Sequence, residues 1–136
     1  MMNESNFIMP NWPAPPNVKA IQTTRLGGVS QPPFAALNLG NFTEDSPADI
    51  QENRRLLLQE LGFEVHDFAT AKQVHGSEVA VVAAGGTYEG CDALITDTKG
   101  ILLGNTVADC VPVLVYDADL PFLIAESMTE RMAANP

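Results

Sequence analysis

The second half of the chain is a series of short segments rich in aliphatic and β-branched residues, each too short to form an independent helix. Glycine, proline and aspartate separate these segments and mark turns at residues 85–86, 97–100 and 117–121. A chain with this pattern has to pair its segments as β-strands. We predict strands at residues 68–74, 78–83, 93–96, 101–106 and 111–116, and a further apolar strand that begins at 122–125.

One helix is predicted before this series, at residues 47–61. Ser46 is a suitable N-cap, Pro47 suits the first helical position, and Gly62 can adopt the left-handed conformation that ends a helix. The apolar residues recur at helical spacing, at Ile50, Leu57, Leu58 and Leu61. The helix therefore has one apolar stripe with which it can pack.

The residues before the helix form three further segments. Residues 1–17 are rich in proline and are expected to be an extended lead-in, and a short strand is predicted at residues 18–24. Residues 25–40 contain three glycines and two prolines, which indicates a long, shaped loop of the kind that tends to carry function. The complete order predicts an α+β fold, mostly β-sheet with one covering helix.

The charge balance limits the ligands of the chain. Seven lysines and arginines against 17 aspartates and glutamates give a net charge of −10. This argues against a protein that binds nucleic acid or an anionic membrane, because both partners need a cationic surface. The first residues have neither the basic start nor the long apolar stretch of a secretory signal. We therefore expect a cytoplasmic protein whose two cysteines are reduced thiols.

Two predicted strands are followed by residues that could bind a metal. Residues 73–76 read Gln-Val-His-Gly, and a neutral imidazole at a strand end can bind a metal or act as a base. Alternatively, His75 is a turn residue whose imidazole is satisfied by a backbone carbonyl. Cys110 is either a buried thiol, the usual fate of a free cysteine, or a thiolate ligand that suits zinc or soft copper.

A third motif lies at the start of the long loop. Arg25 precedes Gly27 and Gly28, and an arginine fork with exposed backbone donors can bind an anion such as phosphate. The alternative is a surface arginine before a glycine turn. Cys91 is interpreted as a small buried side chain. Four aspartates near strand ends are interpreted as ordinary turn residues, whose side chains hydrogen-bond to the nearby backbone. They are Asp92, Asp97, Asp117 and Asp119.

The motifs are more informative together than singly. In order, the chain contains TTRLGGVS, FAALNLG, a helix with Glu52-Asn53-Arg54, KQVHG, CDALIT and NTVADCVPVLVYD. This series resembles the laccase-domain family, also called the YfiH or polyphenol-oxidase family, over roughly residues 18–125. The resemblance implies a cytosolic α/β enzyme that phosphorolyses adenosine, inosine, guanosine and methylthioadenosine, with adenosine deaminase activity. An older description of the family is copper-dependent oxidation of phenols.

The resemblance also implies a set of site residues. The family's metal site uses the histidine of QVHG, the cysteine of ADC and a later histidine, so His75 and Cys110 are the expected ligands. Zinc is the expected metal, with copper as the alternative. The expected substrates are a purine nucleoside and phosphate. Catalytic positions implied by the motifs are Arg25, Asn38 and Asp109, and substrate-binding positions are Arg25, Gly27, Gly28 and Gln73.

The chain departs from the family pattern near residue 126. Residues 126–136 are polar and lack strand alternation, and no histidine follows His75, so the third metal ligand is missing. We therefore expect residues 18–125 to be an incomplete laccase-like domain with impaired activity, followed by a divergent tail. A shifted reading frame is one hypothesis for this change in the sequence near residue 126. The codons for Glu126-Ser127-Met128 can encode Val-His in another frame.

Three other functions stay open. The first is a copper-dependent polyphenol oxidase. The second is a Cys–His hydrolase in which Cys110 is the nucleophile and His75 the base. The third is an inactive fragment that self-associates, as a possible homo-oligomer, through apolar sheet surface or unpaired strand edges.

Overall fold

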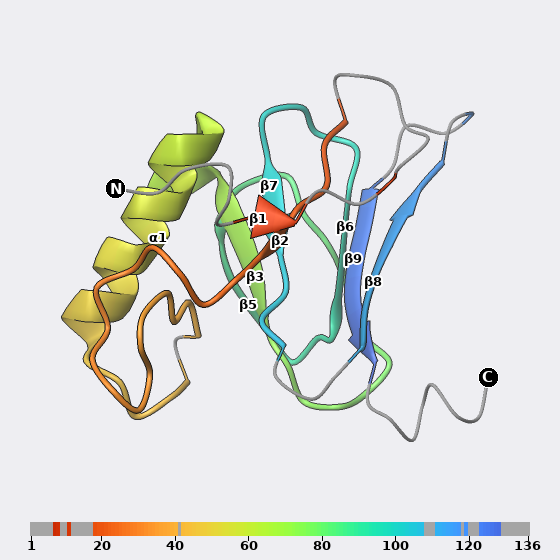
Figure 1. Ribbon diagram of the computed structural model, residues 1–136. Helices are drawn as coiled ribbons and strands as arrows, with labels where there is room; N and C mark the ends of the chain where they lie inside the picture. Colours follow the sequence, from red (N-terminus) through yellow and green to blue (C-terminus); the bar gives the residue numbers. More distant parts are fainter. Residues whose placement is uncertain are drawn as a thin grey trace. The chain divides into compact units, whose positions relative to one another are not determined.

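The computed structural model describes residues 7–8, 11, 18–40, 42–107, 111–117 and 119, and the backbone alone of residues 123–128. These residues form one α-helix and mostly β-strands (Figure 1), which confirms the predicted α+β class. The chain divides into two compact units, Met1–Val65 and His66–Pro136. In the part of the chain described, no helix is both long and apolar enough to cross a membrane.

The first unit contains α1 (Pro47–Leu61) and a short antiparallel pair, β1 (Phe7–Ile8) with β2 (Gln22–Thr23). The helix begins and ends where the sequence predicts, whereas the predicted strand at residues 18–24 is confirmed only at residues 22–23. Gly62 ends the helix in the left-handed conformation, with φ of 80°. Its N–H donates to the carbonyl of Gln59 at 3.2 Å, so the last turn of the helix is closed by the hydrogen bonding typical of a glycine C-cap.

The apolar stripe of α1 packs within the first unit. Leu57 of the helix and Leu37 of the long loop are the buried pair at the centre of this core. Partly buried residues from β1, the position before β2, the loop and the helix pack against them, namely Phe7, Ile21, Leu39, Leu56 and Leu61. Full burial of one such leucine stabilises a fold by roughly 1.5–3 kcal/mol, so this packing attaches the loop to the helix.

The second unit contains two sheets (Figure 1). The first is parallel, in the order β5-β3-β7, and the second is mixed, in the order β4-β6-β9-β8. Strands of the first sheet are β3 (Phe68–Lys72), β5 (Gly86–Glu89) and β7 (Leu102–Gly104). Strands of the second are β4 (Val79–Val81), β6 (Ala93–Thr96), β8 (Val111–Tyr116) and β9 (Leu123–Met128).

The core of the second unit is made of small and aliphatic side chains. Its buried members are Ala69, Ala71, Val82, Cys91 and Leu94. Cys91 behaves as the small buried side chain that the sequence predicts. Burial, and secondarily the neighbouring Asp92 carboxylate, raises the pKa of the Cys91 thiol, so this cysteine stays protonated at neutral pH.

Three strands, β3, β4 and β7, are shorter than the predicted ranges 68–74, 78–83 and 101–106, and two further predictions need correction. Residues 85–86 were predicted as a turn, but Gly86 begins β5, where pairing with β3 supplies the backbone hydrogen bonds. Residues 126–128 were predicted to lack strand structure, but β9 runs through them to Met128. Glu126 pairs with residues of both β6 and β8. Pairing with two neighbouring strands stabilises the extended conformation although the sequence is polar.

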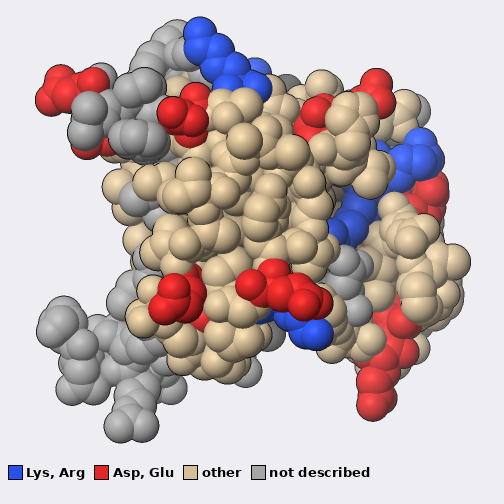
Figure 2. Space-filling model, turned by 180° about the vertical axis from the view of Figure 1, so that it is seen from behind, with Lys and Arg blue, Asp and Glu red and all other residues tan. Residues whose placement is uncertain are grey.

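The outer strands of the mixed sheet carry exposed apolar side chains. Val81 of β4 is 81% exposed. Others that are exposed on β4 and β8 are Val79, Val111, Leu114 and Val115. Figure 2 shows one face of the molecule, on which lysine and arginine side chains lie in separate groups with uncharged side chains between them.

Candidate functional site

The long loop before the helix is held by four polar side chains, Ser30, Asn38, Asp45 and Asn53, which we call the Asn53 cluster. Asn53 lies in α1 and is fully buried, with 0% exposure. Its amide oxygen accepts the N–H of Val29 at 2.7 Å. Its amide nitrogen donates to Ser30 Oγ at 2.9 Å and to the carbonyl of Asn38 at 2.8 Å. All three hydrogen bonds join the helix to the loop.

Asp45 forms the outer side of this cluster. Ser30 Oγ donates to Asp45 Oδ2 at 2.5 Å, and Asn38 Nδ2 donates to the same oxygen at 3.1 Å. These hydrogen bonds, chiefly the one from Ser30, hold the pKa of the Asp45 carboxyl below its ordinary value. Asp45 Oδ1 also accepts the N–H of Ser46 at 2.8 Å. Ser46 precedes the helix as predicted, but its side chain makes no capping hydrogen bond.

Four of the predicted site residues lie in this loop. The carbonyl of Arg25 accepts two backbone N–H groups from across the loop, at 3.0 and 2.9 Å, and the residue is exposed. Gly27 has a positive φ of 96°, and Gly28 lies against the Asn53 cluster. The Asn38 amide makes hydrogen bonds within the loop, so its observed contacts position the loop. Substrate binding by these residues stays a prediction.

We expect Gly28→Ala to destabilise the first unit by about 1–3 kcal/mol. A Cβ at this position would lie 2.6 Å from both Asn53 Oδ1 and Leu37 Cα, so the loop and helix would have to separate. Gly76→Ala is the control, because its Cβ would make only an ordinary contact, 3.5 Å from Asp92 Oδ2. Chemical denaturation of both variants measures the difference; equal stability would show that the close approach at Gly28 does not constrain the loop.

In the second unit, the turn at residues 73–76 (the QVHG turn) follows β3 and is held by one carboxylate. Asp92 Oδ1 accepts the N–H groups of Val74 at 3.0 Å and His75 at 2.8 Å. Asp92 Oδ2 accepts the N–H of Gly76 at 2.8 Å. His75 has φ of 60°, the left-handed region that non-glycine residues rarely adopt. The turn therefore has a defined backbone conformation.

Asp92 has a role in this turn that the sequence interpretation does not predict. The sequence predicts that Asp92 is an ordinary turn residue. In the structure it is 6% exposed, and its carboxylate accepts hydrogen bonds from a turn 16 to 18 residues earlier in the chain. A buried carboxylate needs hydrogen-bond donors. The sequence does contain one indication of this role. Asp92 stands between Cys91 and a strand of apolar residues, where a charged side chain requires hydrogen-bond partners.

The carboxyl ends of β3 and β7 lie beside each other because these strands are parallel neighbours. Gln73 Nε2 donates to the carbonyl of Thr106 at 3.4 Å, which links the QVHG turn to the segment after β7. The side-chain amide of Asn105 is buried there, and among the described residues neither its oxygen nor its nitrogen has a hydrogen-bond partner. A polar group of this kind at a sheet edge is a position where a ligand atom could bind.

Two predicted site residues, Asp109 and Cys110, lie outside the described residues. Within the described ranges, no group of three or more histidine, cysteine, aspartate or glutamate side chains could hold a metal ion. The structure therefore brings Gln73 and His75 to one sheet edge, and places Arg25, Gly27, Gly28 and Asn38 in the loop of the other unit. The ligand pair His75 and Cys110 stays a prediction.

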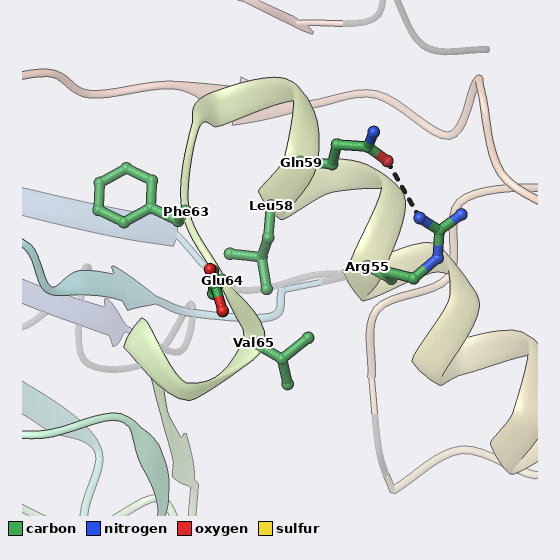
Figure 3. Close-up of a pocket in the computed structure, with 6 residues that line it drawn as sticks. All are labelled: Arg55, Leu58, Gln59, Phe63, Glu64 and Val65. Carbon is green, nitrogen blue, oxygen red and sulfur yellow. Dashed lines mark hydrogen bonds between the residues drawn. The ribbon is translucent and has the colours of Figure 1, made fainter.

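A shallow concavity of about 380 Å³ lies at the end of α1 (Figure 3). Arg55 there donates to Gln59 Oε1 at 3.0 Å and forms an ion pair with Glu52 at 2.6 Å. The other lining residues are Leu58, Phe63, Glu64 and Val65. No residue predicted for substrate or metal binding lines this concavity, so we do not assign it to the candidate site.

Comparisons with known proteins give consistent matches. The sequence matches the family described as "Multi-copper polyphenol oxidoreductase laccase" over residues 19–125. It is 48% identical over 97 residues to the "Purine nucleoside phosphorylase" of Deinococcus radiodurans, covering 71% of this chain and 38% of that protein. It is 39% identical over 112 residues to "Purine nucleoside phosphorylase YfiH" of Escherichia coli, covering 81% and 45%.

Solved structures have the same fold. YlmD from Geobacillus stearothermophilus superimposes with a TM-score of 0.90 at 29% identity, covering 98% of this chain and 53% of that one. Protein NMB0706 of Neisseria meningitidis gives a TM-score of 0.82 at 38% identity, covering 95% and 52%. The chain thus spans about half the length, or less, of the relatives that it matches.

Proposed function

Because this chain belongs to the multi-copper polyphenol oxidoreductase laccase family, we propose that its residues form part of a zinc-dependent purine nucleoside phosphorylase site. Support comes from the names of relatives that are 39–48% identical. The observation that carries the proposal in this chain is the QVHG turn. It holds a potential metal ligand, His75, in a rare backbone conformation beside the strand that leads to Cys110.

The donor set fits zinc. An imidazole nitrogen and a thiolate sulfur are both common zinc ligands, and His75 and Cys110 supply one of each. Cys91 is unsuited to the role because burial favours its protonated thiol. The chemistry that zinc supplies in such a site is Lewis-acid polarisation of a substrate or water oxygen.

The residues of the loop would bind the second substrate. Arg25 is exposed, and its guanidinium can bind phosphate through two parallel hydrogen bonds. In phosphorolysis, a phosphate oxygen forms a bond to ribose C1′ while the bond from C1′ to the purine nitrogen breaks. We assign proton transfer to Asp109 and a positioning role to Asn38, whose amide already holds the loop. We assign nucleoside binding to Gln73, which lies in the QVHG turn next to His75.

The substrates that we propose are adenosine, inosine, guanosine and methylthioadenosine, with deamination of adenosine as a second reaction and the cytosol as the compartment. In these 136 residues, no histidine follows His75. Two protein ligands hold zinc less firmly than three. We therefore propose that this 136-residue chain is by itself a slow enzyme.

A chimera tests this function. Residues 18–125 would replace the matching segment of the Deinococcus radiodurans relative, and purine release from inosine would be measured with and without phosphate. We expect phosphate-dependent release, reduced by more than about 100-fold in the His75→Ala chimera, because a direct ligand should matter more than the residues around it. A folded, zinc-loaded chimera without phosphorolysis would contradict the proposal. Phenol oxidation by its copper-loaded form would then favour the oxidase.

A further inference from the structure

The Asp92 carboxylate binds three successive backbone N–H groups of the QVHG turn, at distances of 2.8 to 3.0 Å. Both of its oxygens are used, two N–H groups on Oδ1 and one on Oδ2. Asp92 is itself fixed, because its own N–H donates to the carbonyl of Glu78 at 3.0 Å. The side chain is therefore a rigid anchor between the start of β6 and the end of β3.

This anchor acts on a strained residue. His75 is the sole non-glycine residue with a positive φ among those that the structure describes. The left-handed conformation is costly for a residue with a Cβ and persists only where neighbouring groups enforce it. Charge-assisted hydrogen bonds are the strongest that can hold the backbone in this conformation. The N–H of His75 donates one of them to Asp92 Oδ1, at 2.8 Å.

We propose that Asp92 is a positioning residue for the metal site: it fixes the backbone from which His75 binds zinc. This inference rests on the proposed zinc site. In many metal sites a carboxylate orients the histidine through its ring nitrogen. Here the carboxylate acts on the main chain, so the imidazole keeps both of its nitrogens for other partners. The entropy cost of fixing the backbone of His75 then arises when the protein folds, and it does not reduce the free energy of zinc binding.

Three variants separate positioning from simple stabilisation. Asp92→Ala removes both acceptor oxygens and with them all three hydrogen bonds, and Asp92→Asn keeps Oδ1 as an acceptor. Thr96→Val is the matched control, because Thr96 is also buried and lies at the end of β6, the strand that Asp92 immediately precedes. Thr96 Oγ1 donates to the carbonyl of Val82 at 2.7 Å and accepts the N–H of Thr98 at 3.0 Å. Thr96→Val therefore removes two hydrogen bonds of a buried side chain without removing a contact of the QVHG turn.

The experiment measures zinc affinity of the full chain by competition with a chromophoric chelator, at a temperature where every variant is folded. We expect the zinc Kd to rise by about 10–100-fold in Asp92→Ala and by a smaller factor in Asp92→Asn, with less than about twofold change in Thr96→Val. In the metal-free protein, hydrogen exchange at Val74, His75 and Gly76 should accelerate in the Asp92 variants alone. If Asp92→Ala does not fold, Asp92→Asn provides the same comparison.

The outcomes distinguish this inference from the function on which it rests. If the wild type binds zinc but both Asp92 variants bind it as tightly as Thr96→Val does, Asp92 only stabilises the fold and the positioning role is wrong. If the wild type binds no zinc, or His75→Ala binds it equally well, the zinc site itself is wrong and the positioning role with it.

Discussion

Replacing Asn53 with alanine should lower the free energy of unfolding by about 2–4 kcal/mol, a large loss for one polar residue. The side chain is fully buried, and its three hydrogen bonds join α1 to the loop that carries Arg25. Alanine would leave the N–H of Val29 and the carbonyl of Asn38 without these partners in a closed environment, and it would leave a small cavity. Urea denaturation measures the loss.

The control for Asn53 is Gln51→Ala, an exposed position on the same helix, for which we expect a change below about 0.5 kcal/mol. Release of the loop should also increase proteolytic cleavage near Arg25 in the Asn53 variant. Equal stability of the two variants would show that the Asn53 cluster does not hold the loop.

Replacing His75 with alanine should weaken zinc binding by more than about 100-fold, because it removes one of only two proposed protein ligands. The chain contains one other histidine, which makes the control direct. His66 is exposed in the short 3-10 helix η2 (Val65–Asp67), and His66→Ala should bind zinc as the wild type does. Calorimetric titration of both variants gives the comparison. If both substitutions weaken zinc binding equally, zinc binds nonspecifically to histidines and the proposed site is wrong.

The secondary structure was largely predictable because local signals specify it. A capping position, a proline at the first turn and a glycine after the last turn define α1, and turn residues bracket β6 and β8. β5 was missed because its first residue, Gly86, looks like part of a turn. Its pairing with β3, some 17 residues earlier, is a tertiary effect that no local pattern contains.

The candidate site was less predictable because its supports are nonlocal. The resemblance identified His75, but nothing in the motif revealed that Asp92 holds its backbone from 17 residues away. The motif that contains Asn53 likewise predicts no role for it, although an amide on the apolar stripe of a helix needs buried partners. In both cases the residue type indicated a requirement for hydrogen bonds, and only the fold identified the partners.

The measurement that tests the zinc site most directly is the absorption spectrum of the cobalt-loaded chain. Co²⁺ substitutes for zinc, and a thiolate ligand gives it an intense sulfur-to-metal charge-transfer band. We predict that this band is present in the wild type, retained in Cys91→Ser and lost in both Cys110→Ser and His75→Ala. A band that persists without Cys110, or that disappears with Cys91, would contradict a metal site built on His75 and Cys110.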